Sequence, residues 1–154
     1  MPSETVHSGT VPTPTPDTLP FWAAAAREER LVIQQCQSCG RHYFYPRDHC
    51  PYCSSGDVQW REVSGRGRLV SYIINYRPLP PADPAEPQVI ALVELDEGVR
   101  MLTNIVGTSP DPEALPLDAA VSVAFEPRGE WKLPVFRLAS DRASDRDSDQ
   151  AGAP

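Results

Sequence analysis

The four cysteines constrain the fold of this chain more than any other feature. They form two Cys-x-x-Cys pairs, Cys36/Cys39 and Cys50/Cys53, with ten residues between the pairs. A two-residue gap lets both sulfurs of a pair point into one tight turn, and Gly40 supplies the positive φ that such a turn commonly needs. Two turns facing each other form a tetrahedral S4 site, which suits Zn²⁺ at about 2.3 Å per sulfur. We therefore predict that Cys36, Cys39, Cys50 and Cys53 bind one zinc ion.

The alternatives to zinc are two disulfides, a redox Cys-x-x-Cys, or iron in the same cage. The N-terminal residues lack the basic and apolar regions of an export signal, and a redox site needs one pair, not two. Four thiolates leave no position open for water or substrate, so we expect the metal to be structural. His42 and His49 flank the pairs and are interpreted as hairpin side chains or as donors outside the metal's own ligand set.

Composition divides the 154 residues into a folded part and two tails. Residues 1–17 are rich in Pro, Thr and Ser, and residues 140–154 alternate Asp, Arg and Ser without a large apolar side chain. Neither segment has enough apolar surface to form a packed core, so both are predicted to be disordered. No apolar run approaches the ~20 residues of a membrane span. We expect a cytoplasmic protein with no membrane partner.

The pattern between the tails predicts a mainly β fold. Residues 18–59 are predicted to form a short helix and a rubredoxin-like zinc ribbon, and residues 60–139 a five-stranded β barrel of the OB-fold type. Thr18 is the expected N-cap of the helix and Gly65-Arg-Gly67 the expected bend into the barrel. Apart from the ribbon strand at 31–35, the predicted strands are 58–63, 68–76, 88–95, 100–106, 120–125 and 133–138.

Charge and side-chain chemistry exclude several functions. The formal net charge is −7, and Lys132 is the only lysine, so the chain is not expected to bind nucleic acid. The predicted barrel has no histidine, and its carboxylates lie near strand ends or turns where solvated surface is the default interpretation. No nucleophile–base pair is evident, so we predict no catalytic residue and no catalysis by the chain alone.

Several motifs in one order carry a resemblance to a known family. They are Leu19-Pro-Phe-Trp22, the two cysteine pairs, Phe44-Tyr-Pro-Arg47, Gly65-Arg-Gly67, the hairpin segment 91–98 and Val121-x-Val-x-Phe125. Together they resemble the zinc-ribbon/OB-fold family catalogued as domain of unknown function thirty-five. The resemblance covers roughly residues 19–138. One departure is that members usually place a glycine where Leu117-Asp118-Ala119 stands.

The resemblance implies a function that the residues alone do not. Proteins of that family pair with thiolase-superfamily subunits, including lipid-transfer-type thiolases, and act on coenzyme A thioesters. The catalytic residues lie in the thiolase-like subunit, and the zinc/OB subunit shapes the acyl-CoA pocket and stabilises its partner. Similar pairs are retro-aldolases or thiolases of steroid and lipid degradation. The resemblance therefore implies an accessory subunit in a heterotetramer, without indicating which of its residues contact coenzyme A.

A set of aromatic residues is predicted to contact that partner. The helix and ribbon have little core of their own, so their rings must pack on something larger. The candidates are Phe21, Trp22, Tyr43, Phe44 and Tyr45, and for each ring the equally weighted alternative is packing inside the chain. The alternative functions are a nucleic-acid-binding OB-fold/zinc-ribbon module and a stand-alone acyl-CoA scaffold.

Overall fold

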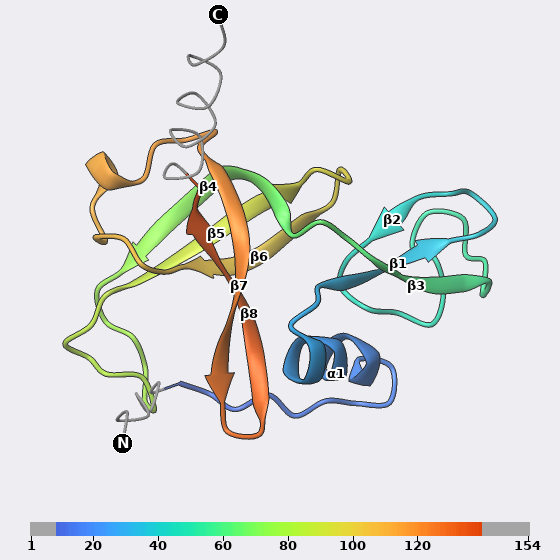
Figure 1. The fold of residues 1–154 in the computed structure, drawn as a ribbon, viewed down its shortest axis with the longest axis horizontal. Helices are drawn as coiled ribbons and strands as arrows, with labels where there is room; N and C mark the ends of the chain where they lie inside the picture. Colours follow the sequence, from blue (N-terminus) through green and yellow to red (C-terminus); the bar gives the residue numbers. More distant parts are fainter. Residues whose placement is uncertain (1–8, 140–154) are drawn as a thin grey trace, which may run out of the picture.

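The computed structural model describes residues 9–139 and confirms a mainly β fold built from a small ribbon and a barrel (Figure 1). One helix, α1, precedes a three-stranded sheet with the order β2-β1-β3. A closed barrel with the strand order β4-β5-β6-β8-β7 follows. The elements are α1 (Leu19–Glu28), β1 (Val32–Cys36), β2 (His42–Tyr43), β3 (Val58–Glu62), β4 (Arg66–Asn75), β5 (Gln88–Leu95), β6 (Arg100–Ile105), the 3-10 turn η1 (Pro112–Ala114), β7 (Ala120–Arg128) and β8 (Trp131–Leu138).

The ribbon sheet extends past the boundary expected at residue 59. β1 lies between β2 and β3, and its antiparallel pairing with β3 runs from Cys36↔Val58 to Val32↔Glu62. The ladder continues beyond β3, because the Val63 N–H donates to the Leu31 carbonyl at 3.0 Å. In the structure, β3 therefore belongs to the ribbon sheet as a whole, and the barrel begins at β4.

The barrel core comes from strict alternation along the strands. In β5 every second side chain, from Val89 to Leu95, is buried, as a strand with one face toward a core requires. Leu69 of β4, Val121 of β7 and Phe136 of β8 are fully buried on the same interior. A parallel contact between β6 and β8 at Ile105↔Phe136 and the β4–β7 pairing close the sheet on itself.

Glycine is required where β4 enters the barrel. Gly65 has φ +71°, in the left-handed region that favours glycine. A Cβ on Gly67 would overlap the carbonyl oxygen of Glu94 on β5, so only glycine allows the two backbones to approach this closely. The register of β4 against β5 then shifts between Leu69 and Ser71, which is the signature of a β-bulge. The bend predicted at Gly65-Arg-Gly67 lies at this position.

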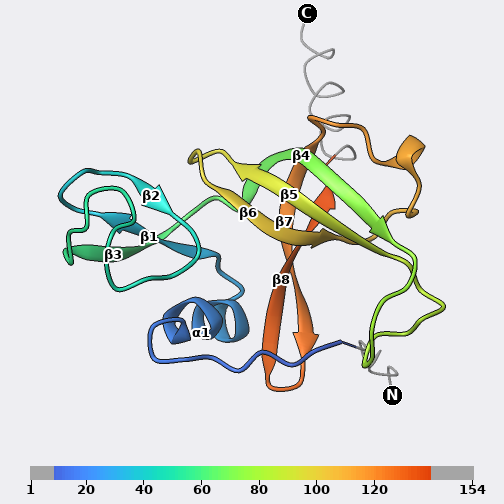
Figure 2. The ribbon, with the colours of Figure 1, turned by 180° about the vertical axis from the view of Figure 1, so that it is seen from behind.

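Helix α1 lies in the corner between the ribbon and the β7–β8 hairpin (Figures 1 and 2). Pro20 is in its first turn, and Glu29 at φ 51° ends it. Thr18 occupies the N-cap position but makes no side-chain cap bond; its Oγ1 instead accepts from the Thr15 N–H at 2.9 Å. Phe21 and Ala25 form the buried face. The helix thus connects the two β units through its apolar side.

The β7–β8 hairpin is longer than predicted. Its ladder runs from Val121↔Leu138 to Arg128↔Trp131, and Gly129 at φ +61° makes the turn. The predicted strands covered 120–125 and 133–138, so the structure adds Glu126 to Arg128 of β7 and Trp131 and Lys132 of β8. The extra length carries the hairpin alongside α1 (Figure 2).

The described part of the N-terminal segment, which begins at residue 9, runs beside the β7–β8 hairpin. Residues 10–15 contain neither helix nor strand, and a Cβ added at Gly129 would lie 3.3 Å from Val11. Residues 1–8 and the predicted tail 140–154 lie outside the described residues. Within residues 9–139 the one helix is too short to cross a membrane.

Candidate metal centre and aromatic surface

The four cysteine sulfurs converge on one point of the ribbon. All four Sγ atoms lie within 4.8 Å of one another. The Cys36–Cys53 sulfur separation is 3.5 Å and the Cys39–Cys50 separation is 3.7 Å. A tetrahedron with about 2.3 Å metal–sulfur bonds has edges of about 3.8 Å, so the arrangement fits a zinc ion. Among residues 9–139, this is the one cluster of ligand-type side chains with such spacing.

Two similar turns hold the sulfurs in place. In the first turn the Gly40 N–H donates to the Cys36 carbonyl at 2.9 Å, and Gly40 has φ +76°. In the second turn the Ser54 N–H donates to the Cys50 carbonyl, also at 2.9 Å, and Ser54 has φ +65°. The second turn thus has the geometry of the first without a glycine. A contact of 2.8 Å between the Ser38 and Ser55 hydroxyls links the two turns.

The electrostatics of the cage favour a bound cation. The backbone N–H of Cys39 lies 3.5 Å from the Cys36 sulfur and is the main cause, with further hydrogen bonds from Cys53 and Ser38, of a pKa lowered to about 6 for that thiol. A backbone hydrogen bond from Ser55 lowers the pKa of Cys53, but hydrogen bonds with the neighbouring thiols and burial together raise it to about 11. Thiolates this close repel one another, so the four cannot all ionise unless a positive ion lies between them. Zn²⁺ is such an ion.

The two histidines beside the cage are not among its ligand atoms. His49 is exposed, and its Nδ1 lies 3.1 Å from the Asp48 carboxylate. His42 lies in β2, where it pairs with Gln35. Closed S4 coordination leaves no position for substrate, so the geometry favours a structural centre.

The predicted aromatic set divides by burial. Phe21 and Tyr43 each keep only 3% of their surface exposed, so packing inside the chain accounts for both rings. Tyr43 packs against Cys36 and Cys50 behind the metal cage, and its hydroxyl donates to the Arg47 carbonyl at 3.1 Å. Trp22 and Phe44 are half-buried against the main core, and Tyr45 is 49% exposed. Contact with a partner stays a prediction and now concerns chiefly Trp22, Phe44 and Tyr45.

The rings of Phe21, Trp22 and Phe44 connect the ribbon to the helix. The Phe21 and Trp22 centroids are 5.1 Å apart in an edge-on arrangement, and Phe44 lies 5.4 Å from Phe21. Tyr45 extends the series outward, 5.3 Å from Phe44 and edge-on to it. We call Trp22, Phe44 and Tyr45 the aromatic surface.

The fold and the site together define a four-cysteine zinc ribbon joined to an OB-fold barrel. Residues 23–59 match the family model of the ChsH2 rubredoxin-like zinc ribbon domain, and residues 60–126 match that of the ChsH2 C-terminal OB-fold domain. The chain belongs to the ChsH2-type DUF35 family, as the resemblance implied.

Relatives of this chain include parts of enzymes and a scaffold protein. A chain of the solved Ltp2-ChsH2(DUF35) aldolase is 39% identical, with a TM-score of 0.70 over 83% of this chain and 98% of that one. A probable enoyl-CoA hydratase alpha subunit of Thermomonospora curvata is 42% identical over 77% of this chain but only 37% of its own length. A DUF35 domain-containing scaffold protein of Methanothermobacter thermautotrophicus is 33% identical over 62% of this chain and 72% of its own length. The chain thus spans little more than a third of the hydratase subunit.

The fold also forms a pocket that no sequence motif indicated. It lies between the proline-rich loop 77–87, the ends of β5 and β6, and the β7–β8 hairpin. Its polar residues come from separate segments of the sequence and form no motif, so only the closed barrel brings them together.

Proposed function

We propose that this chain is a non-catalytic subunit of a heteromeric enzyme that makes or breaks carbon–carbon bonds in coenzyme A thioesters. The partner is a thiolase-like subunit of the lipid-transfer type, and the complex is a heterotetramer. The acyl group belongs to a lipid or steroid side chain, and the reaction is retro-aldol cleavage or thiolysis. The catalytic residues lie in the partner.

The observation that carries the proposal is the likeness to the Ltp2-ChsH2(DUF35) aldolase chain. This chain covers 98% of that chain at 39% identity, so the likeness includes the ribbon, the helix and the barrel rather than one module. The names of the enoyl-CoA hydratase relative and of the aldolase support a multisubunit enzyme that acts on CoA thioesters.

Zinc has a structural role in this proposal. Cys36, Cys39, Cys50 and Cys53 would hold the ion, and the ion would fix both turns of the ribbon. Tyr43 packs against the cage from inside, while Phe44 and Tyr45 follow it in sequence and extend toward the surface. The metal therefore positions part of the aromatic surface that we assign to partner contact. It takes no part in the chemical step.

Purification of the full-length chain from its native host tests the proposal. We expect a thiolase-superfamily protein to copurify in equal amount, and the complex, but neither subunit alone, to cleave or thiolyse an acyl-CoA. Mass spectrometry identifies the partner, and light scattering gives the stoichiometry. Turnover of an acyl-CoA by the chain alone would refute the assignment, and so would copurification with an unrelated protein only.

A scaffold that binds an enzyme without being required for its turnover is the second candidate, favoured by the name of the Methanothermobacter thermautotrophicus relative. The two candidates differ in one measurement. If the copurified partner retains full turnover after this chain is removed and the partner's own stability is unchanged, the chain is a scaffold rather than a required subunit.

A further inference from the structure

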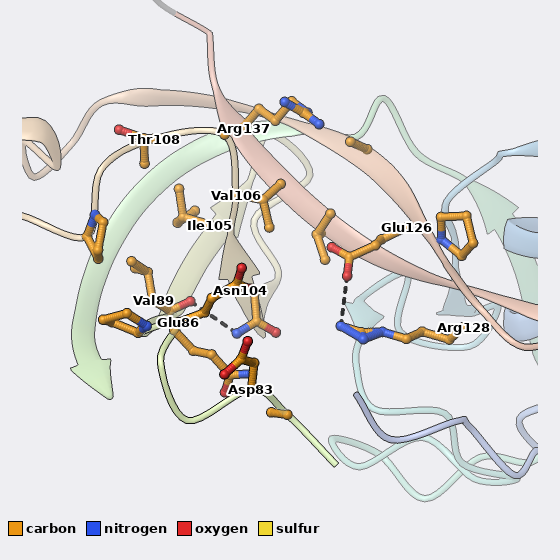
Figure 3. A pocket seen from close by; sticks show the side chains of 18 of the residues that line it. Asp83, Glu86, Val89, Asn104, Ile105, Val106, Thr108, Glu126, Arg128 and Arg137 are labelled. Carbon is orange, nitrogen blue, oxygen red and sulfur yellow. Dashed lines mark hydrogen bonds and ion pairs between the residues drawn. The ribbon is translucent and has the colours of Figure 1, made fainter. Parts of the chain in front are cut away.

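A cavity of about 890 Å³ lies at one side of the barrel, in the described part of the chain. Pockets that hold molecules of cofactor or drug size have volumes of about 300 to 1,000 Å³. One wall consists of β7 and β8, another of the ends of β5 and β6, and the proline-rich loop covers the remaining side (Figure 3). The cavity is separate from the zinc ribbon, and no ribbon residue lines it.

Arg128 is the unusual residue of this pocket. Its side chain extends from the end of β7 into the cavity (Figure 3) and is only 10% exposed. Its Nη2 pairs with the Glu126 carboxylate at 2.9 Å. Its Nε and Nη1 are buried and have no hydrogen-bond partner among residues 9–139. Buried donors without an acceptor are costly, and those of a charged group especially so. This guanidinium therefore has two nitrogens left to bind an acceptor oxygen.

The rest of the lining indicates what carries that oxygen. Among residues 9–139, three carboxylates (Asp83, Glu86 and Glu126) and two guanidiniums (Arg128 and Arg137) line the pocket, and together they carry a formal charge of −1. A polyanion such as a phosphate ester would be repelled, whereas a single carboxylate on Arg128 adds only one charge and gains charge-assisted hydrogen bonds. Apolar side chains complete the lining, among them Phe125, which is half-buried, and Val89, Ile105 and Val135, which keep only 2 to 4% of their surface exposed.

We propose that this pocket binds an amphipathic monocarboxylate, a small molecule with one carboxylate and an apolar body, and that Arg128 binds the carboxylate. The apolar body lies against Val89, Ile105 and Phe125. Asn104 is fixed beside them, because its Nδ2 donates to the Val89 carbonyl at 3.1 Å, so its amide oxygen remains as a nearby acceptor (Figure 3). The proposal concerns the chain alone and does not rest on the proposed function.

The N-terminal segment controls access to Arg128. A Cβ on Gly9 would collide with Nη1 of Arg128, so the backbone at Gly9 lies directly against the guanidinium. A carboxylate that reaches Nη1 must displace this backbone. Gly9→Ala inserts a methyl group at that contact and should weaken it. We therefore expect this variant to bind the carboxylate several-fold more tightly than the natural chain.

Isothermal titration of the zinc-loaded full chain tests the site with a matched pair of probes. 4-Phenylbutyrate and 4-phenylbutyramide share the apolar body and differ in charge, and coenzyme A serves as the polyanion. We expect the carboxylate to bind at least tenfold more tightly than the amide, as is typical of a charge-assisted hydrogen bond. Coenzyme A should bind more weakly than the carboxylate. Equal affinity for the acid and the amide, or a preference for coenzyme A, would overturn the proposal.

Substitutions in and outside the pocket test whether the preference for the carboxylate comes from the Arg128 guanidinium. Arg128→Gln should lose at least tenfold in affinity for the carboxylate and nothing for the amide. Glu126→Gln removes a competing carboxylate and should tighten binding, a gain that an unfolded or loosened variant cannot give. Arg61→Gln, an arginine of β3 bonded to Gln59 outside the pocket, is the matched control and should bind normally. If Arg128→Gln binds the acid as well as the natural chain does, Arg128 is not the carboxylate-binding residue and the proposal fails.

Discussion

The ring of Phe44 in the ribbon lies 5.4 Å from that of Phe21 in α1, at an interplanar angle of 50°. Phe21 is buried in the same core as Leu69 and Phe136 of the barrel, so the contact connects the ribbon to the rest of the molecule. A ribbon of three short strands has little apolar surface of its own. Its orientation therefore depends on a few such contacts.

We expect Phe44→Ala to destabilise the isolated chain by about 2 to 3 kcal/mol, somewhat less than a fully buried phenylalanine because Phe44 is only half-buried. Tyr45→Ala is the matched variant. That ring is 49% exposed, so its loss should change stability by less than about 0.5 kcal/mol. Urea unfolding of the isolated chain measures both changes.

The Phe44→Ala and Tyr45→Ala variants also distinguish core packing from partner contact. Tyr45→Ala should weaken association with the copurified partner about tenfold, as loss of an interface aromatic does. A Phe44→Ala variant that loses stability but keeps its partner affinity per folded molecule would remove Phe44 from the aromatic surface and leave it in the core. Unchanged affinity in the Tyr45 variant would remove Tyr45 from the aromatic surface.

Zinc removal should unfold the ribbon. Elemental analysis should give about one zinc per chain, the stoichiometry of a single S4 site. Cys39→Ser should lose the metal, because one thiolate of a closed tetrahedral site is missing, while His49→Ala should retain it. Circular dichroism on addition of a strong chelator should follow the same loss of structure. Intact disulfides in a metal-free protein would contradict the zinc assignment.

Asp118 has a φ of +64°, in the left-handed region that favours glycine. Its N–H donates to the Leu69 carbonyl at 2.8 Å, and its carboxylate pairs with Arg68 on the surface. Asp118→Ala should cost about 1 kcal/mol, because alanine tolerates the left-handed region poorly. Asp118→Gly should stay within about 0.5 kcal/mol of the natural chain, since glycine adopts this φ freely and an exposed ion pair contributes little. Both variants lose the carboxylate, so their difference in urea unfolding isolates the backbone effect.

Glu94 gives the barrel a pH-dependent contribution to stability. Hydrogen bonds from Arg100 and Arg68 lower the pKa of Glu94 below its ordinary value of 4.5. A lowered pKa in the folded state stabilises the fold above the unfolded-state value, and this contribution disappears as the pH falls through the folded-state pKa. Glu94→Gln should therefore be less stable than the natural chain at pH 7, with the difference vanishing at pH well below 4.5. A difference that persists at a pH of about 2 would contradict this origin.

Nucleic acid should not bind this barrel. The formal net charge of −7 and the single lysine oppose contact with a phosphate backbone. Fluorescence anisotropy with a labelled single-stranded oligonucleotide at physiological salt should show no submicromolar binding. Salt-dependent binding in that range would return the OB-fold to the class of nucleic-acid-binding modules.

Local sequence determined the zinc ribbon and most strands. The Cys-x-x-Cys spacing places two sulfurs in one turn whatever surrounds it, and the alternation in β5 specifies a strand with one buried face. Gly65 and Gly67 predicted the bend into the barrel, because glycines inside a β-rich run mark a bulge or a close approach of two backbones. These features depend on residues within a few positions of one another, and a single chain displays them directly.

The tertiary structure decided how these pieces meet. Phe21 and Tyr43 appear in the sequence as aromatics without a core, but the fold buries one beneath the barrel and the other behind the cysteines. Arg128 gives no sequence signal, yet closure of the barrel buries it in a cavity lined by segments that are distant in the chain. Burial and pocket formation depend on distant pairs such as Ile105↔Phe136, whose meeting no local pattern specifies.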